Sequence, residues 1–198
     1  MKLFGMVTTS ASARYTEHAL RSFFKHTPME RGDRFILIDN DNSYVPGEFA
    51  DRTDILRNPS PLGFAENANQ SIDLARHYGA DLYFLNNDII LTPHWLDPFL
   101  LPDPVILTPF SNRELQYDTP IFKASMIMEL SDYLGHEEGL EKLSEVHRGA
   151  AKGYRKVVVA PFFVVKLPLQ IMNALGHFDE SFGKGGGEDY DYCLRAYL

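Results

Sequence analysis

Three short clusters of carboxylate and amide side chains stand out as the residues that could do chemistry. They are Asp39-Asn40-Asp41-Asn42-Ser43, Asn86-Asn87-Asp88 and Glu188-Asp189, and each follows an apolar run or a glycine-rich stretch. Gathered carboxylates repel one another and lose solvation when they are buried. Such a gathering therefore points to a metal ion, a catalytic base or a bound ligand.

The first cluster directly follows an apolar run that ends at Ile38. One interpretation is that Asp39 accepts hydrogen bonds from a nucleobase or a ribose. The other is that these residues form an ordinary turn, because Asp and Asn side chains bond readily to nearby backbone. The cluster alone leaves both interpretations open.

The second cluster places Asp88 after the amides Asn86 and Asn87. A carboxylate in this setting suits a hard divalent cation that keeps several waters and takes its other ligands from phosphate oxygens. His94 follows closely enough to support such a site. A polar turn before Pro93 is the alternative.

The third cluster follows three consecutive glycines, Gly185, Gly186 and Gly187. Glycines let the backbone approach a ligand closely, and the helix expected from Glu188 favours ionised carboxylates in its first turn. An ionised carboxylate is what a general base for a sugar hydroxyl requires. The alternative is a flexible loop followed by acids of the kind common at helix starts.

Short apolar runs alternate with helical patterns, which predicts βαβ units and a mainly parallel α/β sheet. The expected strands are 3–7, 34–38, 54–57, 81–85, 105–107, 157–160 and 162–165. The expected helices are 15–26, 64–78, a short one opened by Pro93, one or two within 124–154 that break near Gly135 or Gly139, 169–175, and one from Glu188. The three clusters then lie beyond the carboxyl ends of strands, where open α/β sheets bind ligands.

The helix expected from Phe64 begins at Gly63 and carries Asn67 and Asn69. Helix N-termini bind anions, yet no phosphate-loop pattern follows here, so ordinary packing of this helix against the sheet is an equal alternative.

Composition narrows the class of protein. The chain has 198 residues, which suits one domain, and a formal net charge of -8, which argues against a nucleic-acid partner. Its one cysteine, Cys193, excludes an internal disulfide and predicts a buried thiol in a reducing compartment. No apolar stretch is long enough for a transmembrane segment. We expect a cytoplasmic protein that can work at the membrane surface.

In this order the clusters resemble the family-2 glycosyltransferases of GT-A fold over nearly the whole chain. The matching pieces are Ile38–Ser43, Asn58, Gly63-Phe64-Ala65, Asn69, Phe84–Asp88, Gly176–Phe182 and Gly187–Arg195. The resemblance implies a single-domain, Rossmann-like sheet flanked by helices. Residues 1–198 would form the catalytic domain, with a nucleotide-binding half at about 1–100 and an acceptor half at about 101–198.

The resemblance also implies an inverting, metal-assisted transfer from a nucleoside-diphosphate sugar, with UDP-sugars favoured and dTDP- or GDP-sugars as alternatives. The acceptor would be a glycan, a lipid-linked molecule or a protein. By analogy the nucleotide site comprises Thr8, Thr9, Asp39, Asn67 and Asn87, and Asp88 binds Mn²⁺ or Mg²⁺. Asp189 is the implied base, and Gly186, Gly187, Glu188 and Asp191 the implied acceptor site, with Glu188 counted among the catalytic residues.

The chain also departs from that family. Asn86 stands where an aspartate usually begins the metal motif, and Thr8-Thr9-Ser10 replaces the usual end of the first strand. The chain ends at Leu198, soon after the last expected helix, so we expect a short member of the family or a trimmed one. Asn86 and the short end favour a second hypothesis, a non-catalytic module that binds nucleotide sugars or glycans. A third, a nucleotidyltransferase, ranks low because residues 8–14 hold one Arg and no Gly.

Overall fold

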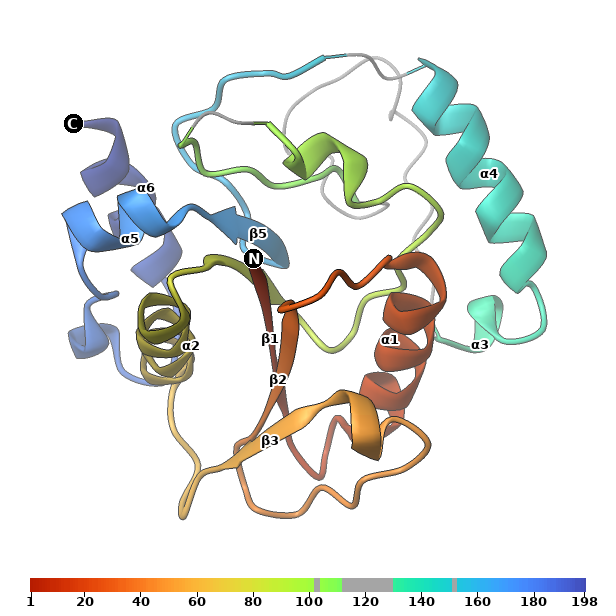
Figure 1. The fold of residues 1–198 in the computed structure, drawn as a ribbon, viewed down its shortest axis with the longest axis horizontal. Coiled ribbons are helices and arrows are strands. Elements are labelled where there is room, and N and C mark those ends of the chain that lie inside the picture. The colour runs from red at the N-terminus through yellow and green to blue at the C-terminus, as the bar shows by residue number, and fades with distance from the viewer. Residues whose placement is uncertain (102–103, 112–129, 151–152) are drawn as a thin grey trace.

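Five strands form one sheet in the order β3-β2-β1-β4-β5 (Figure 1). The structure, a computed structural model, describes residues 1–101, 104–111, 130–150 and 153–198. The strands are β1 (Lys2–Thr8), β2 (Arg34–Asp39), β3 (Asp54–Arg57), β4 (Asp81–Leu85) and β5 (Val164–Leu167). The first four are parallel, and β5 pairs antiparallel with β4. The predicted α/β fold with a mainly parallel sheet is confirmed.

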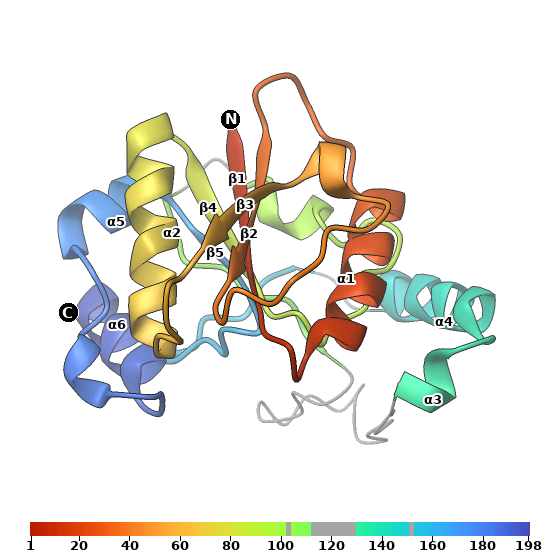
Figure 2. The ribbon, with the colours of Figure 1, turned by 90° about the horizontal axis from the view of Figure 1, so that it is seen from below.

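Helices cover both faces of this sheet (Figures 1 and 2). Helix α1 (Ala13–His26) lies on one face, with α3 (Leu130–Tyr133) and α4 (Glu137–Ala150) beside it. Helix α2 (Phe64–Tyr78) lies on the other, with α5 (Leu169–Leu175) and α6 (Glu188–Tyr197). The chain moves outward from β1 to β2 and β3 and then crosses back to β4. Because crossovers between parallel strands are right-handed as a rule, helices on crossovers that run in opposite directions, such as α1 and α2, lie on opposite faces.

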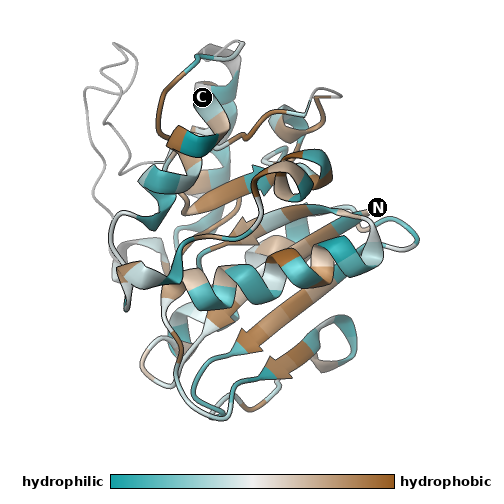
Figure 3. Ribbon diagram, turned by 90° about the vertical axis from the view of Figure 1, so that its left-hand side faces the viewer, coloured by the Kyte–Doolittle hydropathy of each residue, from teal (hydrophilic) through white to brown (hydrophobic). Residues whose placement is uncertain are grey.

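Each strand contributes to two hydrophobic cores, because successive side chains point to opposite faces of a sheet. On β4, Leu82 and Phe84 pack on the α2 side, while Tyr83 and Leu85 pack on the α1 side. All four are at most 2% exposed. The strands are accordingly among the most apolar segments of the ribbon (Figure 3), as expected for parallel strands covered on both sides.

Two of the expected strands are wrong. Residues 157–160 form no strand, and residues 105–107 contribute only an isolated bridge between Leu107 and Lys166. The strand expected at 162–165 lies at 164–167 instead. Pro161 separates these segments and lacks the N–H that a strand ladder needs. The N–H of Ala160 instead contacts the sulfur of Cys193 at 3.4 Å.

Most of the predicted helices are present. The one expected to open at Pro93 is not: turns and a 3-10 turn at Asp97–Phe99 occupy that segment instead. The predicted break falls near Gly135, whose φ is +82°, while Gly139 lies inside α4; residues 124–129 of that prediction lie outside the described residues. Cys193 is buried as predicted, and burial raises the pKa of its thiol. None of the helices in the described ranges has the length and apolarity to cross a membrane.

Candidate functional site

A cleft of about 290 Å³ opens at the carboxyl end of the sheet, between β1 and β4. In the sheet order, β1 is followed by β2 on one side and β4 by β5 on the other, and ligands of α/β sheets bind where the connections part in this way. The cleft is lined by Val7, Thr9, Ser12, Asn40, Leu62, Gly63, Phe64, Asn67 and residues 84–88. Its wall is therefore mainly amide, hydroxyl and apolar, with the single carboxylate of Asp88.

A chain of hydroxyls fixes Asn87 at the floor of the cleft. The Asn87 side-chain amide donates to Ser12 Oγ at 2.7 Å and to Thr16 Oγ1 at 2.9 Å. Ser12 Oγ lies 2.9 Å from Thr9 Oγ1, and Thr16 Oγ1 lies 2.6 Å from Thr8 Oγ1. Of the predicted nucleotide-binding residues, Thr9 and Asn87 line the cleft, while Thr8 is buried behind them.

A buried amide network shapes the opposite wall. The side-chain amide of Asn58 donates to Asn40 and to Asn67, both at 2.9 Å. Asn40 and Asn67 in turn donate to the carbonyl of Leu62, at 3.0 and 3.3 Å. Both residues also line the cleft, so the predicted residue Asn67 lies at the site, and its hydrogen bond to Leu62 ties the neighbouring turn to it.

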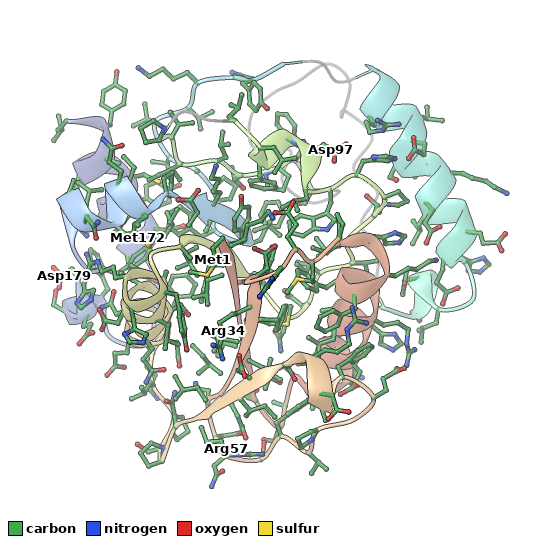
Figure 4. The ribbon with its side chains drawn as sticks, in the orientation of Figure 1. Met1, Arg34, Arg57, Asp97, Met172 and Asp179 are labelled. Atoms are coloured by element: carbon green, nitrogen blue, oxygen red, sulfur yellow. The ribbon has the colours of Figure 1, made fainter. Side chains whose placement is uncertain are left out.

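Asp39 lies beneath the site and is not part of the lining. Its carboxylate is fully buried and accepts the backbone N–H groups of Ser43 at 3.0 Å and Tyr44 at 3.1 Å. It also pairs with Arg57, labelled in Figure 4. The first cluster thus forms a turn whose backbone N–H groups bind Asp39, as one of the two interpretations expected. Recognition of a nucleobase by Asp39 stays a prediction.

Arg57 is a residue that the sequence analysis missed. Besides pairing with Asp39, it donates to the carbonyl of Tyr44 at 3.0 Å. A signal was available, because Arg57 ends β3 as Asp39 ends the adjacent β2, and the two are register partners. Ser12 was missed too, although serine is a common N-cap residue directly before a helix.

Asp88 lies exposed in the cleft lining, and the described structure gives it no hydrogen bond or ion pair. A carboxylate free of protein partners fits a divalent cation that takes most of its ligands from water and phosphate. The described residues hold no group of three His, Cys, Asp or Glu side chains that could share a metal ion. His94 does not support Asp88, since its ring contacts Asp97 at 3.1 Å. The protein would thus supply few metal ligands.

The glycine-rich loop packs against the rim of the cleft. A Cβ atom added to Gly63 would overlap the carbonyl oxygen of Gly183, and one added to Gly185 would lie 3.7 Å from Phe64 Cβ. Gly63 and Phe64 both line the cleft. The loop follows φ values of +74° at Gly183 and +138° at Gly185, which side chains would strain. In Figure 2 this blue segment reaches the N-terminal end of α2.

The loop leads directly to the predicted base and acceptor residues. Glu188 is only 6% exposed, and its carboxylate turns back to accept the N–H of Gly186. Asp189 is half-buried, with Oδ1 accepting the N–H of Tyr190 at 2.9 Å. Oδ2 accepts no hydrogen bond from the described residues. Glu188 thus positions the loop, while Asp189 keeps one carboxylate oxygen for an external group.

Gly186, Gly187 and Asp191 complete the predicted acceptor site, and none of them lines the cleft. Gly186 and Gly187 belong to the loop at its rim. Asp191 instead forms an ion pair with Arg195 at 2.8 Å. Because Arg195 also donates to the carbonyls of Leu175 and His177, this pair fastens α6 to the end of α5.

Asn69 anchors the segment that precedes the loop. Its side chain accepts the N–H of Phe178 at 2.8 Å and donates to the Phe178 carbonyl at 3.1 Å. We expect Asn69→Ala to lower the free energy of unfolding by about 1–3 kcal/mol, because both buried backbone groups lose their partner. Urea denaturation measures this. Asn173→Ala, at an exposed position of α5, is the control and should change stability by less than about 0.5 kcal/mol; equal effects would contradict the anchor.

Gly63→Ala tests the contact between the loop and the cleft. Gly63 has an ordinary φ of −75°, so alanine strains no backbone there, but its Cβ would overlap Gly183. We expect the free energy of unfolding, measured by urea denaturation, to fall by about 1–3 kcal/mol, which is the usual effect of overpacking. Gly139→Ala, in α4 with nothing within 4 Å, should instead gain about 0.5–1 kcal/mol. A gain in both variants would show that the loop does not pack on Gly63.

Solved structures of glycosyltransferases share this fold. The chain superposes with a TM-score of 0.59 on GalNAc-T7 with UDP, GalNAc and Mn²⁺, at 11% identity over 98% of this chain and 40% of that one. The mannosyltransferase PcManGT from Pyrobaculum calidifontis, in complex with GDP-Man and Mn²⁺, gives 0.56 at 9% identity over 96% and 50%. S. aureus TarS (residues 1–349) gives 0.53 at 11% identity over 100% and 55%.

At this level of identity the likeness is one of fold. The chain has a GT-A-type architecture, and it spans between 40% and 55% of the length of these three structures. No protein-family model and no curated protein matches its sequence.

Proposed function

We propose that this chain is the catalytic domain of a glycosyltransferase that uses a nucleoside-diphosphate sugar. The observation that carries the proposal is the packing of Gly183 against Gly63. This contact holds the glycine-rich loop, which leads to the helix of the candidate base Asp189, at the rim of a cleft that contains Asp88. A donor site and a base beside one another are what transfer of a sugar to a hydroxyl requires.

The nucleotide would occupy the cleft formed by residues of the first half, about 1–100. Thr9, Asn67 and Asn87 offer it hydrogen bonds directly, while Thr8 and Asp39 hold the wall behind them. The fixed amides favour a flat, polar base, and we favour UDP-sugars over dTDP- or GDP-sugars.

Asp88 would hold the Mn²⁺ or Mg²⁺ ion together with phosphate oxygens and water. When bound, such an ion stabilises the negative charge of the leaving nucleotide. Asp88 itself would contribute an anionic oxygen after β4, and the described residues give it no hydrogen bond or ion pair, which supports this role.

Asp189 would accept the proton of the acceptor hydroxyl through Oδ2 as the hydroxyl oxygen bonds to the anomeric carbon, with inversion. Asp189 lies in the first turn of α6, and helix N-termini attract negative charge. Glu188, Gly186 and Gly187 would shape the acceptor site, and Asp191 would orient α6 through Arg195. The acceptor half, about 101–198, would receive a glycan, lipid-linked or protein hydroxyl, as in polysaccharide or glycoconjugate assembly by family-2 enzymes.

The single buried thiol is in keeping with work in a reducing compartment such as the cytoplasm, including its membrane surface. A second candidate function is a non-catalytic module that binds nucleotide sugars or glycans. It is favoured by Asn86, which leaves the metal motif with one carboxylate.

A donor panel separates these two functions. UDP-glucose, UDP-GlcNAc, GDP-mannose and dTDP-glucose are incubated with the protein, with and without Mn²⁺, and released nucleotide is measured. We expect slow, metal-stimulated release from one donor, since such domains can pass the sugar to water. Binding of a donor without release, with simple glycans also supplied as acceptors, would favour the module.

A further inference from the structure

We propose that Lys184 binds the diphosphate of the donor, as a cation supplied by the glycine-rich loop. This inference rests on the proposed function and adds a residue to the donor site. Lys184 stands between Gly183, which packs on Gly63, and Gly185, which packs on Phe64. Since Gly63 and Phe64 line the cleft, the loop segment that carries Lys184 lies beside the lining.

The cleft needs such a charge. Its lining contains one carboxylate, Asp88, and no lysine, arginine or histidine. The whole chain carries a formal charge of -8. A diphosphate entering this cleft would meet a negative field, and its binding must be balanced by local cations. A metal ion on Asp88 supplies part of that charge, but this carboxylate has no second acidic partner in the motif.

Two arginines of the first half of the chain are already engaged. Arg57 pairs with Asp39 and donates to the carbonyl of Tyr44. Arg14, two residues after Ser12, lies over the ring of Tyr15 with its carbon Cζ 4.6 Å from the ring centroid. In contrast, the described structure gives Lys184 no ion pair or hydrogen bond, and the residue is exposed.

The loop is built to present this side chain. The glycines on both sides have positive φ values, +74° and +138°, and neither carries a side chain that could cover the lysine. Glu188 could neutralise Lys184, but its carboxylate is turned inward onto the N–H of Gly186. A lysine ammonium on a flexible four-carbon stem suits a phosphate group as a compact point charge.

The experiment compares a nucleotide with its nucleoside. UDP, GDP and dTDP are titrated calorimetrically into the wild-type protein in the presence of Mn²⁺, and the one that binds is carried forward together with its nucleoside. We expect Lys184→Ala to weaken binding of the diphosphate about ten-fold or more and to change binding of the nucleoside less than about two-fold. Lys184→Arg should restore most of the loss. Lys142→Ala, an exposed lysine on α4, is the control.

The outcomes are distinct. If the wild type binds a diphosphate and Lys184→Ala binds it equally well, Lys184 has no such role and the proposed function still stands. If Lys184→Ala weakens diphosphate and nucleoside alike, the lysine acts on the loop and the inference is overturned. If the wild type binds none of the three diphosphates with Mn²⁺ present, the proposed function itself falls, and the inference falls with it.

Discussion

Asp189→Asn should abolish sugar transfer while leaving donor binding intact. The substitution keeps the shape of the side chain and the hydrogen bond that Oδ1 accepts from Tyr190, but an amide cannot take a proton from the acceptor hydroxyl. Removal of a general base typically costs 10²–10⁴-fold, so we expect a loss of about 100- to 10,000-fold in kcat. The Kd for the nucleotide should change less than about two-fold.

The control for this variant is Asp51→Asn. Asp51 is exposed and lies just before β3, at the amino end of the sheet, opposite the cleft. Asp51→Asn removes the same charge as Asp189→Asn does, and this control should retain full turnover. Steady-state kinetics with the active donor measures both variants. If Asp189→Asn keeps a tenth or more of wild-type kcat, Asp189 is not the base.

Asp88→Ala should remove the effect of metal on nucleotide binding. If Asp88 is the protein ligand of the ion, Mn²⁺ should raise the affinity of the wild type for a nucleoside diphosphate about 10- to 100-fold and leave the variant unchanged. The physical reason is that Asp88 would hold the ion in the cleft, where its charge would offset that of the phosphates. Without Asp88, Mn²⁺ would bind the free nucleotide as strongly as the protein-bound nucleotide, and it would not raise the affinity of the protein for the nucleotide.

Calorimetric titration with Mn²⁺ and with EDTA measures this effect. Asp97→Ala removes a carboxylate from the same connection after β4, where Asp97 contacts His94, and should respond to Mn²⁺ as the wild type does. An equal gain from Mn²⁺ in Asp88→Ala would assign the metal to other ligands.

The sheet and its main helices follow from local patterns that the sequence displays directly. β3, β4, α2 and α5 occupy the predicted residues, because apolar periodicity and flanking glycine or proline mark them without reference to distant contacts. The two strands wrongly predicted at 157–160 and 105–107 depend instead on contacts with residues that are distant in the sequence. Both segments are apolar, but the neighbours they meet, Cys193 and Lys166, are far away in the sequence.

Some residues of the site could likewise be placed from the sequence, and others could not. Asp88 and Asn87 could be placed in the cleft from the sequence, because residues that follow a parallel strand lie at one edge of the sheet. The roles of Asp39 and Asn69 could not, since they depend on which backbone groups approach them. The contact of Gly63 with Gly183 joins residues 120 positions apart, and no local pattern encodes it.

The most direct test of the account is whether this cleft binds a nucleoside diphosphate. Thermal unfolding of the wild-type protein would be followed with UDP, GDP, dTDP and CMP, each with and without Mn²⁺. Because a ligand that binds only the folded state raises its melting temperature, we predict a metal-dependent rise with one diphosphate, UDP before the others. No rise with any of them would contradict a donor site between β1 and β4.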